Sequence, residues 1–260
     1  QKRENMPEGL QALNQYFDKI FVITLHRSED RHAKINKHFA GVDFEYFYGV
    51  DKQNLSYDEL VANNIYNPAR AKKMHRNSKE MQFGHIACSM SHKELYKHIL
   101  EKGYERVLVM EDDFVPAIID EKLYEAINRE LPVDWELVYW GYYLNEKTNF
   151  LMKLKQYYYF LLSALRLIKW TPVKVSNLYP KSYSAHLKKA GFHNTTHAYA
   201  VSKSILQKLI DLQTPVAFNA DTLLTELVMS GKAKAFITVP RVFDQEIFTE
   251  GGSQVSYLSG

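Results

Sequence analysis

The sequence predicts an α/β fold of Rossmann-like character, a single domain with a mixed central sheet and one basic insertion. Short branched apolar runs alternate with stretches of helical spacing through the first half of the 260 residues. An acidic cluster directly follows one of these apolar runs, where open α/β sheets bind their ligands. Neither an internal repeat nor a flexible linker divides the chain, so we expect one folding unit.

The first half of the chain gives the clearest elements. Ser28 and the acidic pair after it predict the start of a helix, and Gly103 is the left-handed residue that ends one. The expected elements are a strand at Lys19–Leu25 buried on both faces, a helix from Ser28 to about Phe39, a strand at Val42–Val50, a helix at Gly84–Leu100, and strands at Arg106–Met110 and Trp135–Trp140, the last stopped by Gly141.

The second half opens with residues 145–190, which have no clean period and contain Pro172 and Pro180. Regular patterns return after this insertion. They predict a strand at His197–Val201, a helix from Ser202 to about Leu212, a helix at Asp221–Met229 that ends at Gly231, a strand at Ala235–Val239, and a mobile tail over 251–260.

Composition excludes several classes of protein. Hydrophobic residues make up 46% and charged residues 24%, which excludes a disordered or fibrous chain. The single cysteine, Cys88, rules out an intramolecular disulfide framework and a zinc site built on several thiolates. The longest uncharged apolar run, Gln156–Leu165, is about half of what a membrane-spanning helix needs. With no signal-peptide pattern after Gln1, we expect a soluble or membrane-surface protein.

Basic residues are concentrated in one segment. Residues 147–210 carry eleven Lys and Arg and no acidic side chain, although the net charge of the whole chain is +3. One interpretation is an anionic partner near this segment, and the other is a solvated basic face. Within it, residues 151–190 also contain the apolar run Tyr157–Leu162. Such a segment can lie in the headgroup layer of an anionic membrane; alternatively, its aromatics pack over the sheet and its lysines face water.

The most informative motif is Glu111-Asp112-Asp113, directly after the apolar strand Arg106–Met110. Three adjacent carboxylates repel one another in a dry site, and a bound cation is one remedy. Oxygen ligands at this density suit Mn²⁺ or Mg²⁺ rather than zinc. The alternative is an acidic, solvated turn.

Two further motifs flank this one. The exit of the first strand, Thr24-Leu25 with Arg27 and Arg31, offers backbone amides and guanidinium groups to a nucleotide, although it lacks the glycine fingerprints of dinucleotide and ATP sites. The second motif is Gly84–His92. Its Ser89 and His92 can share a helix face, but no G-x-S-x-G elbow supports a hydrolase, and inert burial of Cys88 is favoured over a thiol nucleophile.

These motifs, in this order, resemble glycosyltransferase family 25, which contains bacterial lipooligosaccharide β-galactosyltransferases and is related to the collagen galactosyltransferases. The resemblance spans about residues 18–250, and it includes Gly191-Phe192-His193 and Thr196–Tyr199. It implies a GT-A fold, a nucleotide-sugar donor such as UDP-galactose or UDP-glucose, a divalent ion and inversion at the anomeric carbon. It also implies a nucleotide-sugar half over about 18–141 and an acceptor half over about 142–250.

The resemblance and the motifs together assign the site residues. The donor is expected to contact Thr24, Leu25, Arg27, Arg31, Asp51, Ser91, His92, Glu111 and Asp112, and Mn²⁺ or Mg²⁺ is expected to contact Glu111, Asp113 and Gln245. An inverting transfer needs one general base, and we assign this role to Asp221, with helix capping as its alternative. Glu226, Asp244 and Glu246 are the other candidates, and His193 and His197 contact phosphate or acceptor or are structural.

The sequence therefore predicts a metal-dependent hexosyltransferase that acts on a glycan acceptor in lipopolysaccharide or lipooligosaccharide biosynthesis. We expect it in the cytoplasm, peripheral at the inner face of the membrane, where a lipid-linked acceptor is present. Two other functions compete with this one. A non-catalytic homologue could bind a nucleotide sugar or glycan without turnover, and the basic, Tyr-rich residues 147–210 could bind nucleic acid, although no nucleic-acid-binding motif appears.

Overall fold

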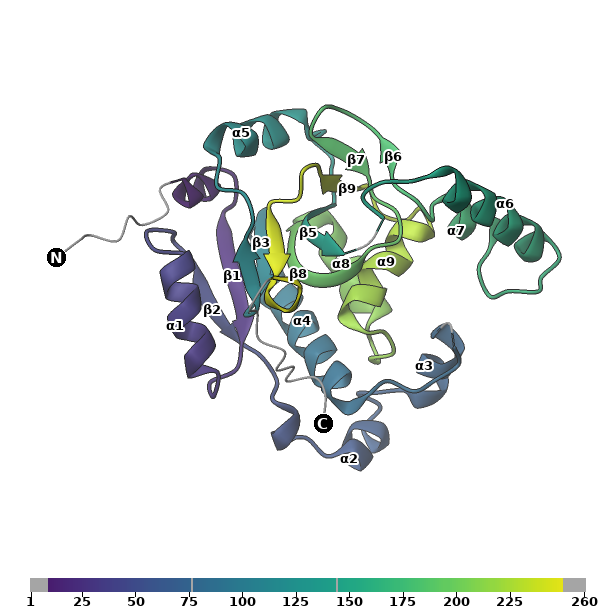
Figure 1. The fold of residues 1–260 in the computed structure, drawn as a ribbon. Coiled ribbons are helices and arrows are strands. Elements are labelled where there is room, and N and C mark those ends of the chain that lie inside the picture. The colour runs from purple at the N-terminus through teal and green to yellow at the C-terminus, as the bar shows by residue number, and fades with distance from the viewer. Residues whose placement is uncertain (1–8, 76, 144, 250–260) are drawn as a thin grey trace.

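A mixed β-sheet forms the centre of the molecule, with helices on both faces (Figure 1). The computed structural model describes residues 9–75, 77–143 and 145–249. The strands follow the order β2-β1-β3-β8-β5-β9-β7-β6. Their bounds are β1 Lys19–Thr24, β2 Glu45–Tyr48, β3 Arg106–Glu111, β4 Phe114–Pro116, β5 Leu137–Tyr143, β6 Lys181–Ser182, β7 Leu187–Lys189, β8 Asn194–Ser202, β9 Ala235–Thr238 and β10 Phe243–Gln245.

The central sheet contains both parallel and antiparallel strand pairs. β1 pairs in parallel with β2 and β3, and β5 pairs in parallel with β9. β8 lies antiparallel between β3 and β5, so the start of β8 meets the carboxyl ends of both neighbours. The α/β fold with a mixed central sheet is thus as the sequence predicts. It also brings residues from both halves of the chain to one edge.

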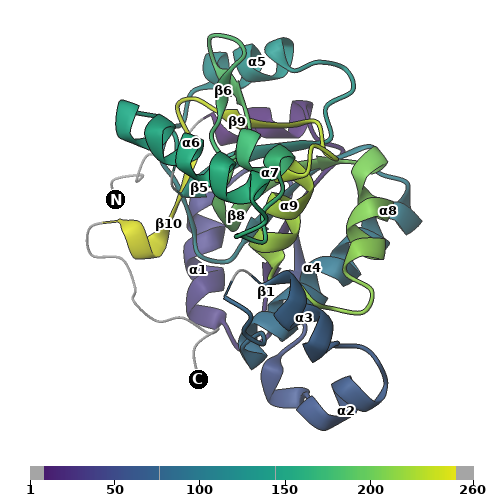
Figure 2. The same cartoon turned by 90° about the vertical axis from the view of Figure 1, so that its right-hand side faces the viewer.

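Two layers of helices cover the sheet, and in Figure 2 α4 and α8 lie to the right of α1. α4, α8 and α9 pack on one face with Phe21 of β1, while α1 and α5 pack on the other with Val22. This alternation buries both faces of β1, as its uninterrupted apolar sequence predicts. The helices are α1 Glu29–His38, α2 Tyr57–Ala62, α3 Pro68–Met74, α4 Phe83–Lys102, α5 Glu121–Glu130, α6 Phe150–Ala164, α7 Pro172–Ser176, α8 Lys203–Leu212 and α9 Ala220–Met229, with 3-10 turns at η1 Leu10–Gln15, η2 Lys52–Asn54 and η3 Glu246–Phe248.

Two sequence expectations about elements are corrected. The second strand is shorter than Val42–Val50, because only Glu45–Tyr48 pairs with β1. Gly141 does not stop β5, which continues to Tyr143. A Cβ atom at Gly141 would lie 2.3 Å from Nε2 of His197, so the glycine lets that ring pack against the strand. The predicted tail over 251–260 lies outside the described residues.

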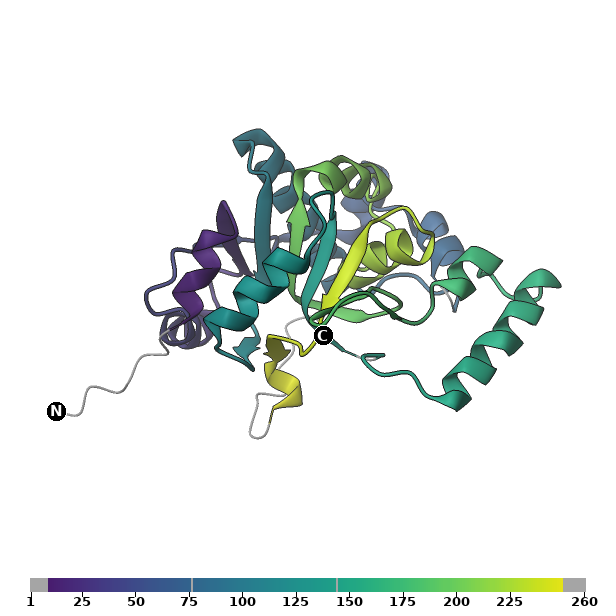
Figure 3. The same cartoon turned by 90° about the horizontal axis from the view of Figure 1, so that it is seen from above.

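The basic insertion is more ordered than its sequence suggests. It forms the fifteen-residue helix α6, the short helix α7 and the hairpin β6–β7, whose strand β7 pairs with β9 and extends the central sheet. α6 projects from the body of the molecule (Figure 3). None of the helices in the described ranges has the length and apolar character needed to cross a bilayer.

Candidate functional site

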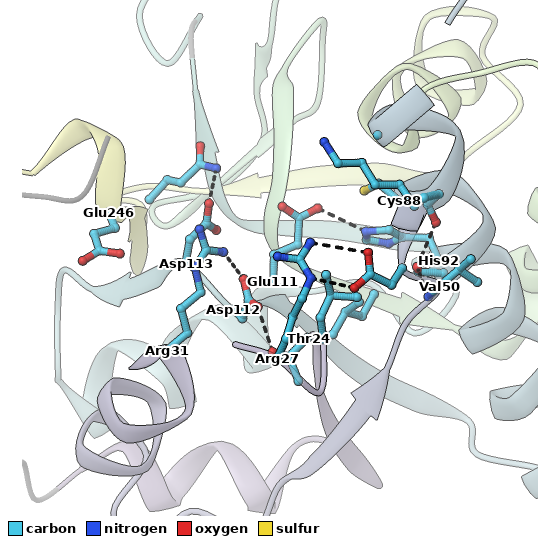
Figure 4. Close-up of a pocket in the computed structure, with 18 of the residues that line it drawn as sticks. Thr24, Arg27, Arg31, Val50, Cys88, His92, Glu111, Asp112, Asp113 and Glu246 are labelled. Carbon is cyan, nitrogen blue, oxygen red and sulfur yellow. Dashed lines mark hydrogen bonds and ion pairs between the residues drawn. The ribbon is translucent and has the colours of Figure 1, made fainter. Parts of the chain in front are cut away.

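A cavity lies at the carboxyl ends of β1 and β3, between α1, the start of α4 and the segment after β10 (Figure 4). This is the sheet edge at which α/β proteins bind ligands. Eleven of the twelve side chains assigned from the sequence line it. These are Thr24, Leu25, Arg27, Arg31, Asp51, Ser91, His92, Glu111, Asp112, Asp113 and Gln245.

The three carboxylates of the acidic motif have separate environments. Glu111 accepts hydrogen bonds from Nε2 of His92 at 3.1 Å and from the Thr196 hydroxyl. Burial opposes ionisation of Glu111, but these hydrogen bonds prevail and lower its pKa. The Glu111 carboxylate is therefore an anion held in place by β8 and α4.

Asp112 turns toward α1 instead. It accepts hydrogen bonds from the Arg31 guanidinium and, at 2.8 Å, from the Thr24 hydroxyl. Burial nevertheless raises the pKa of Asp112, although the Arg31 charge opposes the shift. The pair fixes Arg31 across the cavity wall, where its guanidinium faces the space between Asp112 and Asp113 (Figure 4).

Asp113 is the carboxylate with unmet hydrogen-bonding capacity. Its Oδ2 accepts a hydrogen bond from Nε2 of Gln245 at 2.7 Å. Its Oδ1 is buried and has no hydrogen-bond partner among the described residues. Burial and the negative charge of Glu111 raise the pKa of Asp113 to about 7. A buried, unpartnered oxygen beside a second carboxylate is the arrangement that a bound cation relieves.

The donor set fits a hard divalent ion. Asp113, Glu111 and Gln245 supply carboxylate and amide oxygens, which Mn²⁺ and Mg²⁺ prefer. A softer set lies close by, because ligand atoms of Cys88, His92 and Glu111 all lie within 4.8 Å of one another. Both ring nitrogens of His92 already have partners, however, and burial raises the pKa of the Cys88 thiol well above its usual value. The oxygen set is thus the better candidate.

His92 links the motif to the buried core. Its Nδ1 lies 2.7 Å from the Tyr199 hydroxyl, which lies 2.8 Å from the Tyr96 hydroxyl. All three side chains are almost fully buried. Because both nitrogens of the imidazole are engaged, His92 holds Glu111 in one orientation rather than contacting a ligand freely.

The opposite wall carries cationic and backbone groups. Nε of Arg27 lies 2.6 Å from Oδ2 of Asp51, and this hydrogen bond lowers the pKa of Asp51. Asp51 also accepts the backbone N–H of Gln53 and so caps η2. Ser91 accepts the backbone N–H of Val50 at 2.8 Å, which ties this loop to α4. The loop after β2 is therefore fixed beside the end of β1.

Asp221 is the assigned residue that the structure leaves outside this group. It is the second residue of α9, after the N-cap Asn219, and it is not among the described residues that line the cavity. Its Oδ1 accepts the backbone N–H of Thr222 at 2.7 Å. The segment before Asp221 is nevertheless joined to α4, because the Ser89 hydroxyl donates to the backbone carbonyl of Phe218 at 2.8 Å.

The remaining sequence candidates have structural partners. His197 is buried, and burial lowers its pKa to about 4. His193 is buried and its Nε2 accepts the backbone N–H of Gly191. Glu226 pairs with Lys174, and Asp244 pairs with Arg241. Glu246 differs from these, because it lines the cavity while paired with Lys34.

Sequence reasoning missed several lining residues. Lys52 and Val50 follow β2, and Ile247 follows Gln245. For Lys52, the signal in the sequence was its position next to Asp51. For Ile247 no signal existed, since only the pairing of β10 with β4 brings it to the edge of β3.

Comparison with known proteins identifies one family. The sequence matches the family described as Glycosyltransferase family 25 (LPS biosynthesis protein) over residues 17–224. A Glycosyltransferase 25 family member of Anopheles gambiae is 31% identical over 127 residues, and procollagen galactosyltransferase 2 of Homo sapiens is 28% identical over 130 residues. These alignments cover 47% and 48% of this chain and 21% of each relative. The chain thus spans about a fifth of the length of the curated relatives it matches.

Proposed function

The chain belongs to glycosyltransferase family 25, and on that premise we propose that it is an inverting hexosyltransferase. It moves galactose or glucose from a UDP-sugar to a hydroxyl of a glycan acceptor. The names of the relatives support galactose, since one is a procollagen galactosyltransferase. Residues of about 18–141 bind the donor in this proposal, and residues of about 142–250 bind the acceptor.

One observation carries the proposal. Oδ1 of Asp113 is buried without a partner among the described residues, in a cavity that also holds Glu111 and the guanidinium groups of Arg27 and Arg31. Carboxylates beside cations in one cavity match a ligand that combines a divalent cation with a diphosphate. A polar turn open to water would leave no buried oxygen unpaired.

Each side chain then has a role. Glu111, Asp113 and Gln245 hold Mn²⁺ or Mg²⁺, which when bound offsets negative charge on the departing diphosphate. Arg27 and Arg31 contact phosphate or ribose oxygens, and Thr24, Leu25, Asp51 and Asp112 shape the nucleotide wall. His92 and Ser91 hold Glu111 and the Val50 backbone in position. The acceptor oxygen attacks the anomeric carbon, the bond to the β-phosphate oxygen breaks, and its electron pair leaves with UDP.

The general base receives the acceptor proton. We propose Asp221 for this role, because it lies at the start of α9, directly after a segment that the Ser89–Phe218 hydrogen bond joins to α4. Glu246 is the second candidate, because its carboxylate is part of the cavity wall. Substitution distinguishes the two candidates. Replacing the general base should lower the turnover number and leave the affinity for the donor almost unchanged.

The family description and the basic insertion both bear on the acceptor. The family description names LPS biosynthesis, and the apolar, basic insertion suits a lipid-linked glycan. We therefore propose an acceptor in lipopolysaccharide or lipooligosaccharide biosynthesis and a cytoplasmic enzyme peripheral at the inner face of an anionic membrane. The relatives named procollagen galactosyltransferase make a protein acceptor the competing class.

Release of UDP without an acceptor tests the donor half of this proposal. The protein is incubated with Mn²⁺ and a panel of nucleotide sugars, and UDP is measured as the donor is slowly hydrolysed. We expect release from UDP-galactose or UDP-glucose that stops in excess chelator. Binding of UDP-sugar without release, with or without acceptor glycans, would instead identify a non-catalytic homologue.

A further inference from the structure

The outward face of α6 is apolar and uncovered. Residues 150–173 contain ten of the large hydrophobic side chains exposed in the described part of the chain, and Phe150 and Tyr157 are 77% and 78% exposed. A soluble protein seldom leaves so many large apolar groups together on one projecting element (Figure 3). We therefore expect this face to bind another molecule or surface.

Helical spacing divides α6 into two sides. The half-buried or buried positions of α6 form the side toward the protein, and these are Met152, Gln156, Tyr159, Leu162 and Ser163. Gln156 donates to the backbone carbonyl of Val175, and Ser163 donates to that of Trp170. At 100° per residue the opposite side consists of Phe150, Leu154, Tyr157, Tyr158, Leu161 and Leu165.

Basic side chains flank this outward side. On the helix, Lys153 lies on one flank of the apolar stripe and Lys155 lies on the other, and Arg166 follows the end of the helix. All three are exposed, and no acidic residue occurs anywhere in 147–210. An apolar stripe of Leu and aromatic residues with lysines on both flanks is the pattern of a helix that lies in the plane of a membrane.

We propose that α6 docks on an anionic lipid surface. Its outward side lies at the boundary between the headgroups and the acyl chains, and its flanking lysines contact the headgroups. The role of this docking rests on the proposed function, because docking would bring the cavity to a lipid-linked acceptor. Electrostatic complementarity distinguishes the two possible partners of this outward side, a second copy of the chain and a lipid surface. A second copy of this chain would place two uniformly basic segments against each other, which is unfavourable, whereas anionic lipid complements them.

Co-sedimentation with vesicles tests the docking. The wild-type protein should bind phosphatidylglycerol-containing vesicles at least tenfold more tightly than neutral phosphatidylcholine vesicles at about 0.1 M salt, and lose most of that preference at about 0.5 M. The triple variant Lys153→Gln, Lys155→Gln, Arg166→Gln should bind about a hundredfold more weakly, at roughly fivefold for each charge removed. Leu154→Ser with Leu161→Ser should bind at least tenfold more weakly.

A matched control and a parallel assay keep the outcomes distinct. Val133→Ser with Ile119→Ser removes two exposed apolar side chains outside the segment and should bind vesicles as the wild type does. Every variant is also assayed for UDP release without vesicles, which should be unchanged. If vesicle binding is as expected but no protein releases UDP, the proposed transferase activity is refuted and the docking proposal is not.

Two results overturn the docking proposal. One is equal and negligible binding of the wild type to both kinds of vesicle, which would leave α6 as a lid or acceptor loop. The other is a dimer in sedimentation velocity that Leu154→Ser with Leu161→Ser abolishes, because the outward side would then belong to a second copy.

Discussion

The side-chain amide of Gln245 donates a hydrogen bond to the Asp113 carboxylate at 2.7 Å, although 132 residues separate them. The backbone brings them together, because β10 pairs antiparallel with β4 and the Glu246 N–H bonds to the Asp113 carbonyl. The amide thereby orients one carboxylate oxygen, and the other is buried without a partner among the described residues.

Gln245→Ala should weaken the affinity for Mn²⁺ rather than abolish activity. Removing the group that orients a ligand commonly lowers metal affinity by about 10–100-fold, so the Mn²⁺ concentration for half-maximal UDP release should rise by that factor. Gln207→Ala, an exposed glutamine on α8, is the matched control. An unchanged Mn²⁺ requirement in Gln245→Ala would show that the pair is only structural.

Arg27→Gln should weaken the binding of UDP. Arg27 pairs with Asp51 in the cavity wall, and a guanidinium on a phosphate makes a charge-assisted hydrogen bond whose loss is worth about 1.5–3 kcal/mol. The Kd for UDP, measured by titration calorimetry, should rise by roughly 10–100-fold. Arg106→Gln, at the opposite end of β3, should leave it unchanged. If the two variants bind UDP equally well, the nucleotide lies elsewhere.

Asp221→Asn should lower the turnover number by roughly 10²–10⁴-fold, the usual contribution of a general base, with little change in donor affinity. Glu246→Gln is the paired variant, because Glu246 lines the cavity and Asp221 does not. Comparing kcat and the donor KM for both variants assigns the base. A full kcat in Asp221→Asn together with a collapse in Glu246→Gln would move the role to Glu246.

The buried His197 should make the protein less stable in acid. Burial lowers its folded-state pKa to about 4, whereas the unfolded residue titrates near 6.5. Between these values the unfolded chain binds the proton that the folded chain excludes, so the free energy of unfolding falls as pH decreases from 6.5 to 4, by on the order of 3 kcal/mol. Urea unfolding at pH 7, 5.5 and 4 should give a shallower pH dependence for His197→Gln. Parallel profiles would refute this cause.

The site was predictable where strand ends determine it. Thr24 and Glu111 follow uninterrupted apolar runs, and the carboxyl ends of neighbouring parallel strands meet at one edge. Gln245 was harder to predict, since β10 has three residues and its position depends on pairing with β4. Thr196 reaches Glu111 only because β8 runs antiparallel beside β3, an order that local sequence does not encode.

α6 was missed for a different reason. Sequence periodicity reveals a helix when one side is apolar and the other polar. Here large apolar residues such as Leu154 and Leu161 face outward, while Met152 and Tyr159 face the protein, so both sides of the helix contain apolar residues. Gly141 was misread because a glycine within a strand usually marks its end or a bulge, whereas here it accommodates the His197 ring.

The central claim is that Asp113 holds a divalent cation for the transfer of a hexose from a UDP-sugar. Its most direct test is the rate of UDP release from UDP-galactose and UDP-glucose with Mn²⁺, for the wild type, Asp113→Asn and the exposed control Asp134→Asn. We expect the wild type and Asp134→Asn to release UDP with Mn²⁺ and to stop in excess chelator, and a folded Asp113→Asn to release none. Full activity of Asp113→Asn, or of the wild type in excess chelator, would contradict the account.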